Sequence, residues 1–174
     1  MKISKKCREI IPFKVAIIGL VVLIILIGSV PVLRNSVLDS ISAIYGAVLV
    51  NLTNQNRIAA NISELKVSPI LEKAAQMKAD DMASKNYFAH NTLEGFTPWY
   101  WFDKAGYKYI YAGENLAVNF QNSEDVKTAW MNSKTHWLNI MNPKFKEIGI
   151  ATSTGLYKGR QAVFVVQMFG APVK

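Results

Sequence analysis

An uncharged apolar segment near the N-terminus is the feature that most constrains this chain of 174 residues. Residues 15–33 carry no charged side chain and are bracketed by Lys14 and Arg34. As an α-helix rising about 1.5 Å per residue, the segment would be about 28 Å long, close to the ~30 Å hydrocarbon core of a bilayer. The sequence therefore predicts one transmembrane helix over residues 15–33, by which the chain binds the membrane.

The charges before this segment predict its orientation. Residues 1–14 carry five basic side chains and one acidic side chain, and such a flank stays in the cytoplasm by the positive-inside rule. A cleaved signal peptide is the competing interpretation, but its apolar core would span about 7 to 15 residues and end in an alanine-type cleavage site. Residues 28–36, GSVPVLRNS, lack that site. We expect a single-pass signal anchor in the cytoplasmic membrane, with the N-terminus inside and the C-terminal domain extracytoplasmic.

The rest of the chain is long enough for one domain. We expect a cytoplasmic flank over residues 1–14, the anchor over 15–33, a linker over 34–45 and one extracytoplasmic domain over 46–174. Much of the formal net charge of +8 lies in the flank. The domain has no basic block or basic stripe, which argues against nucleic acid as a partner. Cys7 is the only cysteine, so the exported domain has no disulfide and depends on its core.

Hydrophobic spacing and capping signals predict helices followed by a hairpin. The expected helices cover residues 46–59, 69–86 and 98–104, with a fourth that starts at Ser123 as its N-cap; the expected strands cover 147–152 and 162–169, joined by a turn over 154–160. Ser68 before Pro69 and Thr97 before Pro98 are typical helix starts, and Gly106 is a typical stop. Helices followed by a hairpin indicate an α+β layered domain.

A series of short motifs runs from about Leu49 to Gly170. In order, they are Asn54 with Arg57, Leu65, Leu71 with Ala74 and Ala75, Phe88-Ala89-His90, the run 113–117 (GENLA), the run 130–133 (WMNS) with His136, Asn139-Ile140, Ile148-Gly149-Ile150 and the run 167–170 (QMFG). Each motif alone is weak, but the ordered set resembles the bacterial SCP-like domains of the CAP superfamily (cysteine-rich secretory proteins, antigen 5, pathogenesis-related 1). This resemblance implies a three-layer α-β-α sandwich in which His90, Glu114 and His136 converge on one cleft.

The chain departs from the family pattern at two positions. In many eukaryotic members a second glutamate completes a tetrad, and the corresponding position here is Ser133. Trp101 stands where many bacterial relatives have an arginine. The first departure leaves the catalytic set of the family incomplete.

Three interpretations of the two histidines and Glu114 remain open. Imidazole titrates near neutral pH, so His90 and His136 could move protons, and with one carboxylate they could form a three-ligand Zn²⁺ or Mg²⁺ site with an open position. The third interpretation is structural, with the histidines bonding helix ends or backbone groups. The spacing of the three residues contains no local ligand motif, so their convergence rests on the resemblance.

The segment 96–102, FTPWYWF, is dense in aromatic residues that could line a groove for lipid, peptide or glycan. Trp99 and Phe102 are expected in the core because they lie three residues apart on one helical face, whereas Tyr100 and Trp101 face elsewhere.

Three functions are compatible with the sequence. The first is an envelope binding module that holds a lipid, peptide or cell-wall ligand at the cleft. The second is a hydrolase or protease that uses the same cleft, for which Ser133 and Ser84 are candidate nucleophiles by residue type alone, without a G-x-S-x-G elbow. The third is a protein-interaction module held near the membrane. Whether the chain is an enzyme, and its oligomeric state, are left open.

Overall fold

The computed structural model describes residues 45–173. The predicted flank and anchor, and the linker up to residue 44, lie outside this range, so their assignments stay predictions. Among residues 45–173, no helix is both long and apolar enough to cross a membrane.

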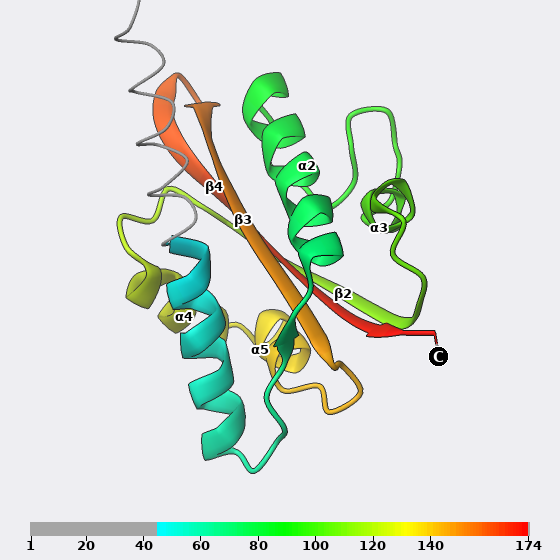
Figure 1. Ribbon diagram of the computed structural model, residues 1–174. Helices are drawn as coiled ribbons and strands as arrows, with labels where there is room; N and C mark the ends of the chain where they lie inside the picture. The colour runs from blue at the N-terminus through cyan, green and yellow to red at the C-terminus, as the bar shows by residue number, and fades with distance from the viewer. Residues whose placement is uncertain (1–44, 174) are drawn as a thin grey trace, which may run out of the picture. The chain divides into compact units, whose positions relative to one another are not determined.

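The described part of the chain forms five helices and a four-stranded sheet (Figure 1). The first helix covers residues 45–59. The elements that follow are β1 (Lys66–Val67), α2 (Pro69–Lys85), α3 (Trp99–Ala105), β2 (Tyr109–Val118), α4 (Ser123–Asn132), α5 (Lys134–Ile140), β3 (Glu147–Tyr157) and β4 (Arg160–Pro172).

The sheet has the strand order β1-β3-β4-β2. The short β1 pairs parallel with β3, whereas β4 pairs antiparallel with both β3 and β2. β2 therefore forms one edge of the sheet, and both of its faces can carry functional side chains.

Side chains of β4 point alternately to the two sides of the sheet. Phe164, Val166 and Met168 belong to a core shared with α2 and α3. Val165 and Phe169 belong to a second core shared with α4, α5 and the helix over residues 45–59. With a helical layer on each face of the sheet, the α-β-α sandwich implied by the resemblance is confirmed.

Two glycines let α2 lie directly on β3. A Cβ atom at Gly149 would lie 2.2 Å from the backbone of Leu71 and Glu72, and one at Gly155 would lie 2.5 Å from the carbonyl oxygen of Ala83. Any larger residue at these positions would push the helix away from the strand.

Most of the expected helices form where the capping signals placed them. α2 starts at Pro69 and ends before Asn86, which adopts a left-handed conformation with φ 58°. α3 ends before Gly106, whose φ is 90°. Glycine and asparagine tolerate this conformation best, which explains why the helices stop there.

Four details of the sequence prediction are wrong. The N-cap of α3 is Pro98, and the helix starts at Trp99, so Thr97 is not its cap and Pro98 is not its first residue. The N-cap of α4 is Asn122, whose side chain accepts from the Asp125 N–H, and not Ser123. The β3–β4 turn is far tighter than residues 154–160, because the strands continue to Tyr157 and restart at Arg160. The prediction also contained no strand at the position of β2, although this strand is ten residues long.

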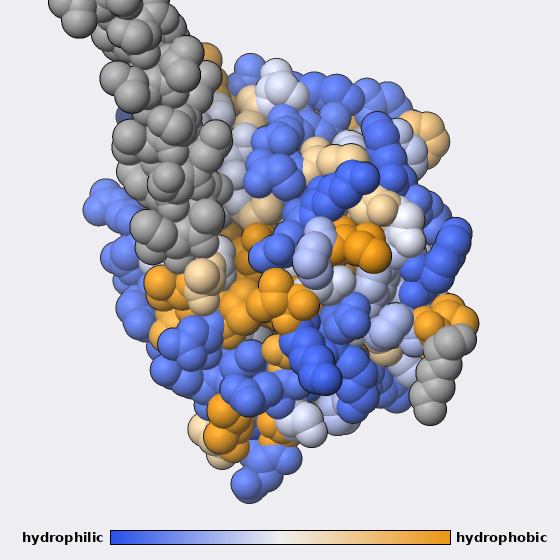
Figure 2. Space-filling view, in the orientation of Figure 1, coloured by the Kyte–Doolittle hydropathy of each residue, from blue (hydrophilic) through white to orange (hydrophobic). Residues whose placement is uncertain are grey.

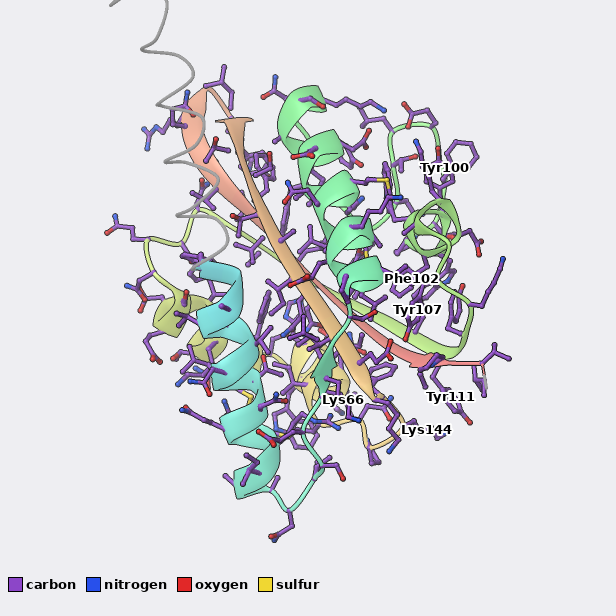
Figure 3. All side chains as sticks on the ribbon, in the orientation of Figure 1. Lys66, Tyr100, Phe102, Tyr107, Tyr111 and Lys144 are labelled. Atoms are coloured by element: carbon purple, nitrogen blue, oxygen red, sulfur yellow. The ribbon has the colours of Figure 1, made fainter. Side chains whose placement is uncertain are left out.

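The aromatic segment is buried in a different pattern from the one expected. Phe102 is fully buried as predicted, but Trp101 is also buried, whereas Trp99 is exposed. Tyr107 extends the cluster, with its ring centroid 6.0 Å from that of Phe102; Figure 3 labels both, together with the half-buried Tyr100. Trp101, Phe102 and the partly buried Tyr100 therefore belong to the core around α3, whereas Phe96 and Trp99 are exposed.

The outer surface on the face shown in Figure 2 is mostly hydrophilic. Hydrophobic side chains gather in the middle of this view, next to the helix over residues 45–59.

Candidate functional site

The candidate site is built on both faces of the edge strand β2. Ala112 and Leu116 of this strand contribute to the core on the α2 side, and Glu114 lies between them on the same face. Ala117 belongs to the core on the α4 and α5 side, and Asn115 shares its face. Consecutive residues of the motif 113–117 thus serve two different layers.

His90 and Glu114 are in direct contact. His90 Nδ1 lies 2.6 Å from Glu114 Oε1. The carboxylate is buried, with its side chain 2% exposed, whereas the imidazole is 56% exposed. The hydrogen bond that His90 makes to the Glu114 carboxylate raises the pKa of His90, and burial raises the pKa of Glu114 against the opposing effects of His90 and Lys78. The pair therefore retains a proton to a higher pH than either group would alone.

Lys78 is a site residue that the sequence analysis missed. It is fully buried, and its ammonium donates to the backbone carbonyl of His90 at 2.9 Å and to the Tyr87 hydroxyl at 3.2 Å. Burial lowers the pKa of Lys78, while Glu114 and Asp81 raise it. Its position in the sequence could have revealed it. Lys78 lies four residues from both Ala74 and Met82, so it shares the buried face of α2 with them.

His136 lies on α5, and its backbone is hydrogen-bonded to a side chain of β2. Asn115 Nδ2 donates to the backbone carbonyl of His136 at 3.3 Å and to Gln167 Oε1 at 2.9 Å. Burial, and then the charge of His90, lower the pKa of His136. The two imidazoles are thus close enough to act on each other electrostatically, although the direct contact is between His90 and Glu114.

Two polar atoms of this site lack a hydrogen-bond partner among residues 45–173. They are Glu114 Oε2 and His136 Nδ1, and both are buried. A buried polar atom without a partner is costly, and native proteins normally satisfy such atoms with protein, water or ligand. Within residues 45–173 these two atoms therefore have no protein partner, and a molecule that enters the site beside the exposed His90 imidazole would satisfy them.

The motif residues Asn54 and Arg57 hold the surrounding frame. Asn54 exchanges two hydrogen bonds with the backbone of Leu65. Arg57 is fully buried and donates from Nη1 to the carbonyls of Ile140 and Asn142, which fixes the end of α5. Arg57 thus positions α5, which carries His136, while Asn54 fixes the segment that leads into β1.

Ser133 does not join the site residues in hydrogen bonding. It separates α4 from α5 in an extended conformation, and its hydroxyl lies 3.3 Å from that of Thr135. Ser133 would lie one helical turn before His136 if a single helix ran through both residues. α4 ends at Asn132 and α5 starts at Lys134, so this helix does not form. Trp101, the other departure from the family pattern, is buried with its indole N–H unpartnered in the described range.

The side chains do not assemble a preformed metal centre. Within residues 45–173, no group of three or more His, Cys, Asp or Glu side chains is placed so that it could hold a metal ion. His90, Glu114 and His136 as placed thus do not fit a three-ligand site. Binding of Zn²⁺ or Mg²⁺ at these residues stays a prediction, which titration with the two metal ions tests.

Comparisons with known proteins agree with this architecture. The family model described as "CAP: Cysteine-rich secretory protein family" matches residues 50–169. The uncharacterized protein YkwD of Bacillus subtilis is 39% identical over 112 residues, which is 64% of this chain but 43% of that protein. The chain thus spans less than half the length of this relative.

Solved structures show the same fold. An extracellular protein containing a SCP domain from Bacillus anthracis is similar, with a TM-score of 0.65 and 25% identity over 75% of this chain and 41% of that one. An outer surface protein from Borrelia burgdorferi has a TM-score of 0.63 and 25% identity over 73% of this chain and 92% of that one.

Proposed function

The chain belongs to the cysteine-rich secretory protein (CAP) family, and from this membership and the site geometry we propose that it binds a ligand of the cell envelope at His90, Glu114 and His136. The ligand class is a lipid head group, a peptide or a cell-wall fragment. The domain acts outside the cytoplasmic membrane, tethered by residues 15–33.

One observation carries this proposal: Glu114 Oε2 and His136 Nδ1 are both buried and unpartnered among residues 45–173. A ligand that donates a hydrogen bond to the carboxylate, and exchanges one with the imidazole, would satisfy both atoms. The pairing of Glu114 with His90 and the contacts of Lys78 hold the carboxylate side of the site ready for such a ligand.

The location is supported by the sequence and by the relatives. The basic flank and apolar segment predict an anchor with the C-terminal domain outside. The B. anthracis structure is of an extracellular protein, and a B. subtilis relative, YlbC, is an uncharacterized membrane protein that is 23% identical over 63% of this chain and 32% of that protein.

Ligand retention tests the proposal. The full chain is extracted from membranes and examined by native mass spectrometry beside Glu114→Gln, which keeps the size of the side chain, and His136→Ala. We expect a bound mass in the wild type that both variants lose, and that the surface control Glu64→Gln retains. A bound mass that is the same in all four proteins, or in none, would contradict the proposal.

A hydrolase is the second candidate, because an exposed imidazole held by a buried carboxylate is the arrangement of a general base and the group that orients it. His90 and Glu114 have this relation. Turnover of peptide and ester libraries is compared between the wild type, His90→Ala and His136→Ala. Equal turnover in all three would remove this candidate.

The metal prediction has its own test. Zn²⁺ and Mg²⁺ are titrated into the full chain by calorimetry, beside a His90→Ala, His136→Ala double variant. A binding heat present only in the wild type would support a metal ligand set that assembles on binding. Identical traces would remove the metal prediction and leave the ligand proposal untouched.

A further inference from the structure

The chain's sheet ends in a cluster of lysines and exposed apolar side chains that the candidate site does not use. The lysines are Lys66, Lys108, Lys144 and Lys146, and all four are exposed. The apolar members are Val67 (51% exposed), Ile110 (61%), Tyr111 (41%) and Val173 (57%). We call these eight residues the basic end.

The fold gathers the basic end from four distant parts of the sequence. The Lys66 N–H donates to the carbonyl of Lys146 at 2.9 Å, and the Lys146 N–H donates to Gly170 at 2.8 Å. The Val173 N–H in turn donates to the carbonyl of Lys108 at 3.1 Å. The start of β1, the segment before β3, the end of β4 and the start of β2 therefore form one continuous border of the sheet (Figure 1).

A side-chain contact ties one of the charges to an apolar residue. The Lys144 ammonium lies 4.6 Å from the centroid of the Tyr111 ring, and Figure 3 shows these two residues side by side. Val67 follows Lys66 directly, and Ile110 comes two residues after Lys108. Each exposed apolar residue therefore has a lysine close by along the chain or across a backbone hydrogen bond, and the pair Lys144 and Tyr111 is in direct side-chain contact.

Few acidic groups oppose these charges. Glu147, which pairs with Lys66 in the sheet register, accepts a hydrogen bond from the Tyr107 hydroxyl at 2.8 Å. Glu64, two residues before Lys66, is exposed. The border therefore carries more positive than negative charge.

We propose that the basic end docks on the surface of an anionic lipid bilayer. Lysines bind anionic head groups electrostatically, and their neighbouring apolar side chains enter the boundary between head groups and acyl chains. Tyrosine suits this boundary because its ring is apolar and its hydroxyl is polar. A soluble polyanion would use the lysines alone, so the apolar residues between them favour a bilayer. Tyr111 lies three residues before Glu114 on β2, so docking brings the candidate site close to the lipid surface.

Lysine footprinting of the full chain tests the docking. The chain is combined with nanodiscs of phosphatidylcholine alone, or with about 30 mol% phosphatidylglycerol, and acetylation of each lysine is followed by mass spectrometry. In the anionic discs, the acetylation rate of the lysines of the basic end should fall to about one third of the rate in neutral discs, or lower. About 0.5 M NaCl should remove this protection by screening. Lys73 on α2 and Lys158 in the β3–β4 turn, both exposed, should react equally in both discs.

A matched pair of variants tests the apolar contribution. Ile110→Ser should reduce the protection in anionic discs, whereas Leu156→Ser, an equally drastic change at an exposed position of β3, should not. Equal acetylation in neutral and anionic discs would overturn the proposal. Protection by inorganic polyphosphate in neutral discs, without protection by anionic discs, would replace it with a soluble polyanion partner. None of these readouts depends on a ligand at His90 and Glu114.

Discussion

The side-chain amide of Asn139 donates to the backbone carbonyl of Glu114 at 3.0 Å. Asn139 lies three residues after His136 on α5, so this bond connects the helix that carries one histidine to the strand that carries the carboxylate. A second bond from the same amide, to Asn115 Oδ1 at 2.9 Å, strengthens the connection. Asn139 therefore joins the two halves of the site without having to touch a ligand itself, beside the bond from Asn115 to the His136 carbonyl.

Replacing this amide should loosen the domain. Asn139→Ala leaves the Glu114 carbonyl and the Asn115 side chain without that donor, and we expect it to lower the free energy of unfolding by about 1 to 3 kcal/mol. Urea unfolding followed by circular dichroism measures the loss. Asn132→Ala, at an exposed position at the end of α4, should change stability by less than about 0.5 kcal/mol. Equal effects of the two changes would contradict the connecting role.

Arg57 should be the more important of the two arginines among residues 45–173. Its buried guanidinium donates to the carbonyls of Ser63, Ile140 and Asn142. Arg57→Met should lower the free energy of unfolding by about 3 kcal/mol, because it leaves these acceptors without their donor. Arg57→Lys should recover little of that loss, since an ammonium cannot reproduce the planar fork of donors.

The matched control is Arg160→Met, which removes an exposed arginine at the start of β4. Thermal unfolding of the three variants beside the wild type decides the question. If Arg160→Met costs as much stability as Arg57→Met, the buried hydrogen bonds of Arg57 do not stabilise the end of α5.

The sequence predicted elements whose signals are local. Pro69 and Asn86 mark the two ends of α2, and Gly106 marks the end of α3, because the conformations at these positions depend on the residue itself. β2 was missed for the opposite reason. Gly113, Glu114 and Asn115 at its centre are poor strand formers, and the strand exists because it pairs with β4 without a break from Tyr111 to Val118.

The site shows the same division. His90 and Glu114 lie 24 residues apart, and their contact forms where the loop between α2 and α3 meets β2 in the tertiary structure. No spacing in the sequence predicts this contact, so His90 and Glu114 were assigned to one site from the family resemblance alone. The break at Ser133 was also hidden, because the residues on either side of it are both helical. Lys78 could have been found, since a lysine on the apolar face of an amphipathic helix is itself a signal.

Gly149 should be intolerant of any side chain. A methyl group there would overlap the backbone of Leu71 and Glu72, so Gly149→Ala should force α2 away from β3 and lower the free energy of unfolding by about 1 to 3 kcal/mol. Gly95→Ala is the control, because Gly95 has φ 88° but no atom within 4 Å of the added carbon. It should cost about 1 kcal/mol from backbone strain alone. Urea unfolding compares the two, and a smaller loss at Gly149 than at Gly95 would contradict the close packing.

Lys85 and Glu94 should make the loop that carries His90 sensitive to acid. Lys85 lies at the end of α2, and Glu94 lies four residues after His90; the Lys85 ammonium is 2.6 Å from Glu94 Oε1. This hydrogen bond is the main cause that lowers the pKa of Glu94 from 4.5 to about 2. A carboxylate with a depressed pKa in the folded state stabilises that state above its ordinary pKa, and the contribution is lost as the pH falls from 4.5 towards 2. Because Glu94 is exposed to solvent and salt, the effect on overall stability should be small.

Carboxyl ¹³C NMR of the full chain measures this pKa directly. We expect Glu94 to titrate near 2 in the wild type and at a higher pH in Lys85→Met, still below 4.5 because hydrogen bonds from Thr92 and the backbone also lower its pKa. Amide exchange over residues 88–94 should be faster in the variant because the restraint on the loop is gone. Lys73→Met, which removes an exposed lysine from the same helix, should leave both measurements unchanged. A Glu94 titration that is the same in all three proteins would show that the ion pair does not restrain the loop.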